Sequence, residues 1–101
     1  MSLLERLLIR LGMRSIYSGG DGSSREEAIV ISAGNIEDGV RAEYEYIQRI
    51  HGPRDRAWKR DVQIKTSAEG RHYDLVSIIL RDGTKEKFWF DITRCYGEWR
   101  L

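Results

Sequence analysis

The pair Asp82-Gly83 constrains the fold of this chain more than any other short segment, because it separates two stretches that are rich in apolar residues. These stretches run over 71–81 and 84–93. Asp-Gly suits a two-residue type I′ turn, in which both central residues need positive φ. We therefore predict an antiparallel hairpin in which Arg81 faces Thr84.

A two-residue turn gives this hairpin two different faces. Counting back from the turn places Leu75 opposite Phe90 on an apolar face, which predicts a core. The same register places Asp74 opposite Asp91 on the other face, which has an apolar middle and a polar end. The candidate ligand or partner residues of this second face are His72, Asp74, Trp89 and Asp91.

Two elements are predicted ahead of the hairpin region. Residues 28–31 are short and rich in β-branched side chains, which favours a buried strand. From Ile36 onward, apolar residues recur at helical spacing and predict an amphipathic helix. This helix should end at His51-Gly52-Pro53, since glycine permits a left-handed cap and proline cannot continue the hydrogen-bond ladder.

One more strand should lead into the hairpin. Val62 and Ile64 alternate with polar residues within 58–66, and Glu69-Gly70 marks a turn. The elements then follow the order of an N-terminal helix and β-α-β-β-β. We expect an α+β fold with a four-stranded, mainly antiparallel sheet and one helix packed on one face.

The first residues form a separate pattern. Leucines recur at helical spacing, and Ser2 with Glu5 has the form of a capping box. The expected partner face of this helix consists of Leu4, Leu7, Leu8 and Leu11. Glycine and serine dominate 18–24 and predict a flexible linker. We expect a tethered helix over 1–17, this linker, and a single α+β domain over 25–101.

Charge and cysteine content narrow the range of functions. Lysine and arginine number 17 against 16 acids, so no global field attracts nucleic acid or membrane lipid. The single cysteine rules out an internal disulfide and a cysteine-rich zinc site, and it fits a reducing cytoplasm. The N-terminal apolar run is too short to span a bilayer. We expect a cytoplasmic protein with no cofactor and no metal.

The local charge is less even than the total. Five cations within 49–60 form a basic patch, and Asp55 is the single acid in this segment. The cations are Arg49, Arg54, Arg56, Lys59 and Arg60. Trp58 lies among them. Such a segment can contact a phosphate backbone while the aromatic ring stacks on a base. Nucleic-acid binding through this basic patch is therefore one alternative function.

The polar end of the hairpin supports a second alternative. Close carboxylates such as Asp74 and Asp91 raise one carboxyl pKa, which general acid catalysis or a cation site requires. With His72 they form a candidate site for metal-dependent or hydrolytic chemistry. No paired histidine or cysteine spacing supports a metal site. A non-enzymatic role is therefore favoured, although the residues leave both open.

The leading hypothesis is a protein-interaction module. The leucine stripe near the N-terminus, Trp89 and the open edges of the predicted sheet all need a covering surface. The expected partner is another protein or a second copy of this chain.

Several segments resemble a family of small bacterial proteins of uncharacterised function. They lie at 52–58, 70–74, 82–83 and 90–97. The resemblance covers most of the chain from Gly22 onward and leaves out the N-terminal leucines. It implies a stand-alone bacterial domain and brings no activity, cofactor or catalytic residue with it.

Overall fold

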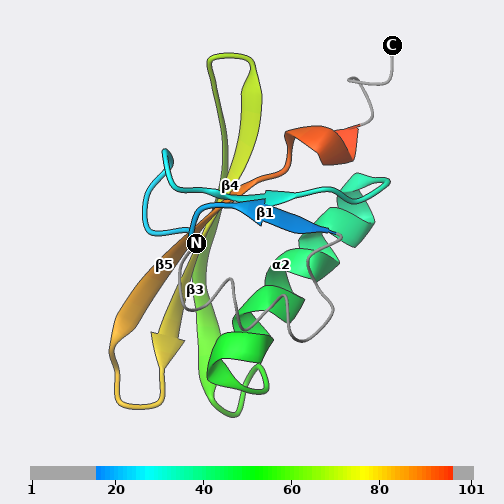
Figure 1. The fold of residues 1–101 in the computed structure, drawn as a ribbon. Helices are drawn as coiled ribbons and strands as arrows, with labels where there is room; N and C mark the ends of the chain where they lie inside the picture. Colours follow the sequence, from blue (N-terminus) through cyan, green and yellow to red (C-terminus); the bar gives the residue numbers. More distant parts are fainter. Residues whose placement is uncertain (1–15, 97–101) are drawn as a thin grey trace.

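The computed structural model describes residues 16–96, which form an α+β fold (Figure 1). The strands are β1 (Tyr17–Gly19), β2 (Ile29–Ile31), β3 (Trp58–Ala68), β4 (Arg71–Leu80) and β5 (Lys85–Asp91). The helix α2 spans Ile36–His51, and the short 3-10 helix η1 spans Thr93–Tyr96. The predicted α+β class is therefore confirmed.

The strands form one mixed sheet in the order β1-β2-β5-β4-β3. The neighbours β3, β4 and β5 are antiparallel, as predicted, whereas β2 runs parallel to β5. Consequently β2 and β3 point the same way, and α2 is the crossover that carries the chain between them. This connection places α2 across one face of the sheet (Figure 1).

The prediction of four strands is wrong because β1 adds a fifth. It pairs antiparallel with β2 and begins at Tyr17, so it overlaps the segment 18–24 that was expected to be a linker. A three-residue strand ending in glycine has no alternation that a sequence pattern can detect. The predicted N-terminal helix, with Leu4, Leu7, Leu8 and Leu11, lies outside the described residues, and the division into 1–17, 18–24 and 25–101 stays a prediction.

The helix α2 begins and ends where the sequence predicts. The Asn35 side chain accepts a hydrogen bond of 2.8 Å from the Asp38 N–H, which caps the first turn. Gly52 ends the helix at φ 98°, and its N–H donates to the Gln48 carbonyl at 2.8 Å.

The β4–β5 hairpin turns at the predicted place but through three residues instead of two. The Gly83 N–H donates to the Leu80 carbonyl at 2.9 Å, and the Leu80 N–H donates to the Thr84 carbonyl at 2.8 Å. Gly83 has φ 89°, so the loop is a type I turn followed by one left-handed residue. The extra residue shifts the pairing by one, and Leu75 lies opposite Trp89 rather than Phe90. The predicted register is therefore wrong.

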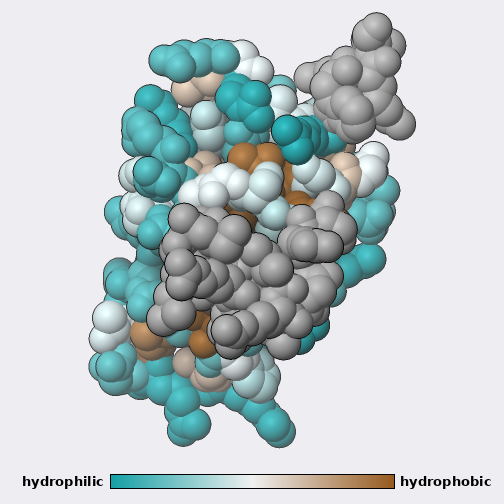
Figure 2. All heavy atoms as spheres, viewed as in Figure 1, coloured by the Kyte–Doolittle hydropathy of each residue, from teal (hydrophilic) through white to brown (hydrophobic). Residues whose placement is uncertain are grey.

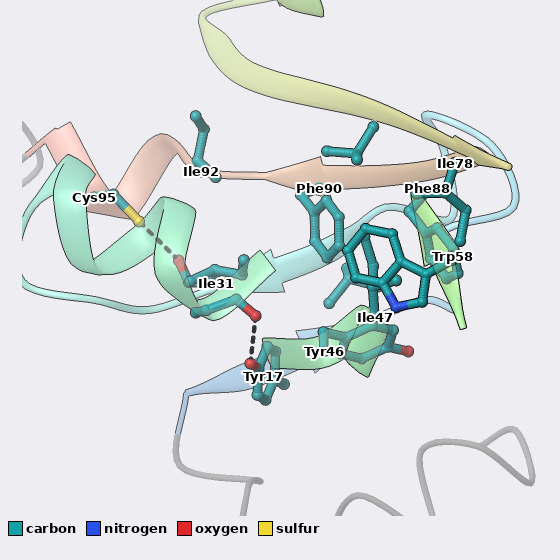
Figure 3. Close-up of a cluster of buried hydrophobic side chains, with 13 residues drawn as sticks. Tyr17, Ile31, Tyr46, Ile47, Trp58, Ile78, Phe88, Phe90, Ile92 and Cys95 are labelled. Carbon is teal, nitrogen blue, oxygen red and sulfur yellow. Dashed lines mark hydrogen bonds between the residues drawn. The ribbon is translucent and has the colours of Figure 1, made fainter. Parts of the chain in front are cut away.

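The core lies between α2 and one face of the sheet. Hydrophilic residues predominate on the surface shown in Figure 2, while the apolar residues gather in the interior shown in Figure 3. Tyr46 of α2 meets Phe90 of β5 edge-on, with ring centroids 5.8 Å apart. Ile47 and Ile78 are fully buried in the same cluster.

Polar atoms tie the edges of this core to the backbone. The Tyr17 hydroxyl donates to the Ala42 carbonyl at 2.6 Å, which fastens β1 to α2 (Figure 3). At the other end, the buried Trp58 indole donates to the Gly52 carbonyl at 2.9 Å. Both aromatic rings are therefore held in place as well as buried.

Candidate functional site

The sheet face turned away from α2 has no helix over it within residues 16–96, and we call it the open face. Its apolar side chains come from β2, β3, β4 and β5: Val30, Val62, Ile64, Tyr73, Leu75, Ile79 and Trp89. Val62 is 43% exposed and Ile64 49% exposed, more than any other large hydrophobic side chain in the described residues. Exposed aliphatic neighbours on one strand mark a surface that another molecule can cover.

The strand β3 has exposed apolar side chains, but its backbone edge is protected from pairing with another strand. It is the last strand of the sheet, and its pairing with β4 shifts between Arg60 and Val62. A bulge and charged side chains keep an edge strand from pairing with other sheets. The side chains of β3 are therefore more accessible to a partner than its backbone is.

The charges of the open face do not balance. The Asp91 carboxylate accepts a hydrogen bond of 2.6 Å from Arg71 Nε, and Asp61 lies 3.6 Å from Lys85 Nζ. Each of these two carboxylates thus has a cation beside it. Three further cations have no ion pair among the described residues: Lys59, Arg81 and Lys87. Around Val62 and Ile64 the open face is therefore basic as well as apolar, whereas near Tyr73 it borders Glu26, Glu27 and Glu69.

Asp91 is fixed in its ionised form. Burial alone raises its pKa, but hydrogen bonds from Arg71 and from the side chain and backbone N–H of Thr93 lower it below the ordinary value. The carboxylate accepts hydrogen bonds from all of these donors, so it holds the chain after β5 against β4.

On the opposite face, α2 and β4 bury a pair of carboxyl groups. Glu43 and Asp74 are both fully buried. Burial, followed by the hydrogen bond with Asp74 and its charge, raises the pKa of Glu43 to about 10, against a smaller opposing effect of Lys65. No donor from residues 16–96 reaches either Glu43 oxygen or Asp74 Oδ1. A proton on Glu43 supplies that donor, and the raised pKa keeps this proton on Glu43 at neutral pH.

This acid pair belongs to a closed polar network. The Gln63 amide donates to Asp74 Oδ2 at 3.0 Å, and the Tyr44 hydroxyl donates to the Gln63 oxygen. Because neither carboxyl group has exposed surface, a substrate has no direct access to it. The network is suited to ordering the core rather than to acid catalysis.

The predicted cluster of His72, Asp74 and Asp91 does not assemble. With a three-residue loop, Asp74 lies opposite Phe90 under α2, while Asp91 lies opposite Tyr73 on the open face. His72 stacks on Tyr96 with ring centroids 4.1 Å apart. The predicted pairing of the two aspartates is wrong. Within 16–96, no three histidine, cysteine or acidic side chains are grouped to hold a metal.

Trp89, the remaining residue of the predicted surface, lies on the open face. Its ring meets Tyr73 edge-on, with centroids 6.4 Å apart and an interplanar angle of 82°. Of the four residues in the predicted surface, Trp89 and Asp91 share the open face, and His72 and Asp74 share the other.

The five cations of the basic patch do not lie together in the structure. Arg49 lies in the last turn of α2, and the Arg54 guanidinium lies 4.7 Å above the Tyr44 ring. Arg60 pairs with the buried Ile78 and so points to the α2 side of the sheet, whereas Lys59 before it points the other way. Only Arg56 and Lys59 line the same hollow, next to Arg81 of the β4–β5 loop.

Sequence reasoning missed Glu43 and the exposure of β3. Glu43 stands in the same helical stripe as Gly39, Tyr46 and Ile47, so an acid in the buried stripe was a usable signal. Val62 and Ile64 were recognised only as the apolar half of an alternating strand. Their exposure depends on which face α2 covers, and a local pattern does not contain that information.

No family model, curated protein or solved structure matches this chain, so the resemblance to small bacterial proteins stays a prediction. Among the described residues, no helix has the length and apolar character needed to cross a membrane.

Proposed function

We propose that this chain is a non-enzymatic protein-interaction module whose open face docks an apolar segment of a partner protein bordered by carboxylates. The observation that carries the proposal is the exposure of Val62 and Ile64 beside the unpaired Lys87. An apolar centre with a polar, charged border is the usual composition of a protein interface.

Aliphatic side chains favour a protein partner over a nucleic acid. Recognition of single-stranded bases relies on aromatic planes that stack on them. On the open face, Val62, Ile64 and Leu75 present branched aliphatic groups, while the rings of Tyr73 and Trp89 pack edge-on against each other. Leucine, isoleucine or valine side chains of a partner match that surface better than bases do.

Charge decides between the available protein partners. A second copy would bring Lys59, Arg81 and Lys87 against equally basic surroundings, which like-charge repulsion disfavours. The chain's own residues 1–15 carry three arginines and one glutamate, so their charge also matches poorly. A partner with carboxylates around its apolar residues complements the unpaired cations.

Two amphipathic peptides of equal length test this proposal. Both carry leucines on one helical face, and the other face carries glutamates in one peptide and lysines in the other. We expect the glutamate peptide to shift the amide resonances of β3 and β5 and the Trp89 indole resonance of the full chain. The lysine peptide should bind at least about tenfold more weakly because like charges oppose docking. Equal affinity for both peptides would contradict the proposal.

A matched pair of variants locates the peptide on the surface. Ile64→Thr removes an exposed aliphatic contact and should weaken binding of the glutamate peptide, whereas Gln48→Ala on the exposed side of α2 should leave it unchanged. Displacement of the peptide from the same residues by single-stranded DNA would favour the nucleic-acid alternative instead. Self-association through these residues would favour a homodimer.

A further inference from the structure

A hollow of about 700 Å³ lies where the basic patch meets the β4–β5 loop. Arg56, Lys59 and Arg81 line it, together with the carboxylate of Asp55. Ile79 and Leu80 form an apolar wall. The hollow adjoins the open face at the hairpin end, but it shares no lining residue with the hollow of about 520 Å³ around Ile64.

A tight turn between α2 and β3 builds one side of this hollow. The N–H groups of Arg56 and Ala57 donate to the Pro53 carbonyl, and the Asp55 N–H donates to the Trp58 carbonyl at 2.7 Å. Asp55 adopts φ 67°, a left-handed conformation that is uncommon outside glycine. The chain thereby folds back on itself, and Arg56 reaches the same hollow as Lys59.

The charges in the hollow match one particular kind of ligand. Arg56, Lys59 and Arg81 are all exposed, and none has an ion pair among the described residues. With Asp55, the hollow carries three positive charges and one negative charge, a net charge of about +2. A phosphate monoester carries a charge of about −1.5 to −2 at pH 7 and offers three acceptor oxygens. Arginine side chains bind such oxygens in pairs.

We propose that this hollow binds a small organic phosphate. The phosphate oxygens accept hydrogen bonds from Arg56, Lys59 and Arg81, and the organic part contacts Ile79 and Leu80. Asp55 opposes binding and sets a limit on affinity. This site shares Lys59 and Arg81 with the border of the open face, but it shares no residue with the surface around Ile64.

A small phosphate fits the arrangement better than a nucleic acid. A strand of nucleic acid needs a track of cations that continues over several phosphates. Here the track stops on both sides of the hollow, because Arg54 is placed over Tyr44 and Arg60 points to the other side of β3. The convergence is local and suits one phosphate group.

Titration of the full chain with phenyl phosphate and with inorganic phosphate tests the proposal. We expect saturable shifts in the amide resonances of Arg56, Lys59 and Arg81 and in the Trp58 indole resonance, which reports on the buried edge of the hollow. Phenyl phosphate should bind more tightly than inorganic phosphate, because only its ring contacts the apolar wall. Equal affinities, or shifts that do not saturate, would overturn the proposal.

Three variants separate this site from general attraction of anions. Arg81→Ala should weaken phenyl phosphate binding by roughly tenfold or more, as expected for the loss of one charged hydrogen bond. Asp55→Asn should strengthen it, because an opposing charge is removed. The matched control Arg60→Ala, one residue along β3 from Lys59, should leave affinity unchanged. Equal weakening by Arg60→Ala and Arg81→Ala would contradict a local site.

Three further measurements complete the test. Circular dichroism should show that Arg81→Ala, a change in an exposed loop, keeps the fold. An oligonucleotide that binds more tightly than phenyl phosphate and loses affinity in Arg60→Ala would replace this proposal with a nucleic-acid track. Ile64→Thr should keep phosphate binding, so failure of the open-face proposal and failure of this one are distinguishable.

Discussion

The two faces of one sheet differ although their residues alternate along the same strands. Under α2, neighbouring strands contribute Val76, Ile78 and Phe90 to a closed core, and the acid pair Glu43 and Asp74 is sealed within it. On the open face, aliphatic side chains and unpaired cations face outward. The contrast indicates that the α2 side stabilises the fold, while the open face leaves aliphatic side chains exposed.

Truncation of one side chain on each face compares most directly how much the two faces contribute to the free energy of unfolding. Ile78→Ala removes a fully buried side chain from the core and should lower the free energy of unfolding by about 2–5 kcal/mol. Ile64→Ala removes a half-exposed side chain and should cost less than about 1 kcal/mol. Denaturant unfolding followed by tryptophan fluorescence measures both. Similar losses for the two variants would show that the open face is covered in solution.

The second prediction concerns the proton held by Glu43. Its pKa is about 10 in the folded protein and near 4.5 in the unfolded chain, so unfolding releases this proton at any pH between the two values. The group therefore favours the folded state fully below pH 4.5 and progressively less as pH rises toward 10. Between pH 4.5 and 7 the loss amounts to about 3 kcal/mol.

Glu43→Gln isolates this effect from the other titrating groups. The amide supplies a donor to Asp74 but cannot ionise, so the stability of the variant relative to the natural chain should rise with pH by about 1.4 kcal/mol per unit. Urea unfolding between pH 5 and pH 9 measures the difference. Parallel stability curves for the two proteins would mean that Glu43 is ionised inside the folded protein.

Asp91, on the open face, should show the opposite dependence on pH. Its pKa is lowered, so its contribution to stability is present above the ordinary carboxyl value of 3.8 and is lost as pH falls below it. Asp91→Asn weakens the bonds from Arg71 and Thr93 and should cost about 1–2 kcal/mol at pH 7. The gap between variant and natural chain should narrow in acid. A gap independent of pH would contradict the charged pairing.

The smallest predicted effect concerns the loop that sets the register of the two faces. Gly83→Ala places a side chain at φ 89° and should cost about 1 kcal/mol, although no atom crowds the added carbon. Gly34→Ala is the matched control, since Gly34 also has open space but no positive φ, and its stability should stay the same or rise slightly. Thermal unfolding compares the two. An equal response would mean that the loop tolerates another conformation.

The sequence predicted most of the described elements because their signals are local. Helix α2 has apolar residues at helical spacing and Gly52-Pro53 after it, and the strands of the hairpin are apolar-rich segments on either side of Asp82-Gly83. The strand β1 was not predicted because three residues are too few to show a periodic pattern. The α+β class, the position of α2 and the antiparallel order of β3, β4 and β5 were all correct.

The candidate surface was harder to predict because the length of one loop decides which side chains lie on it. Asp82-Gly83 indicates a turn, but two-residue and three-residue loops both accommodate this pair. The observed loop moves Asp74 under α2 and leaves Asp91 outside, which separates the residues of the predicted site. The acid pair with Glu43 joins α2 to β4, and no local pattern specifies a contact between residues so far apart in the chain.

The central claim is that the open face is uncovered in the free protein, and carbene footprinting of the full chain at low concentration tests it most directly. We expect strong labelling of Val62 and Ile64 and little labelling of Val76 and Ile78, which lie under α2. Protection of Val62 and Ile64 to the level of Val76 and Ile78 would show that another part of the chain, or a second copy, already covers this face. That result would contradict the claim.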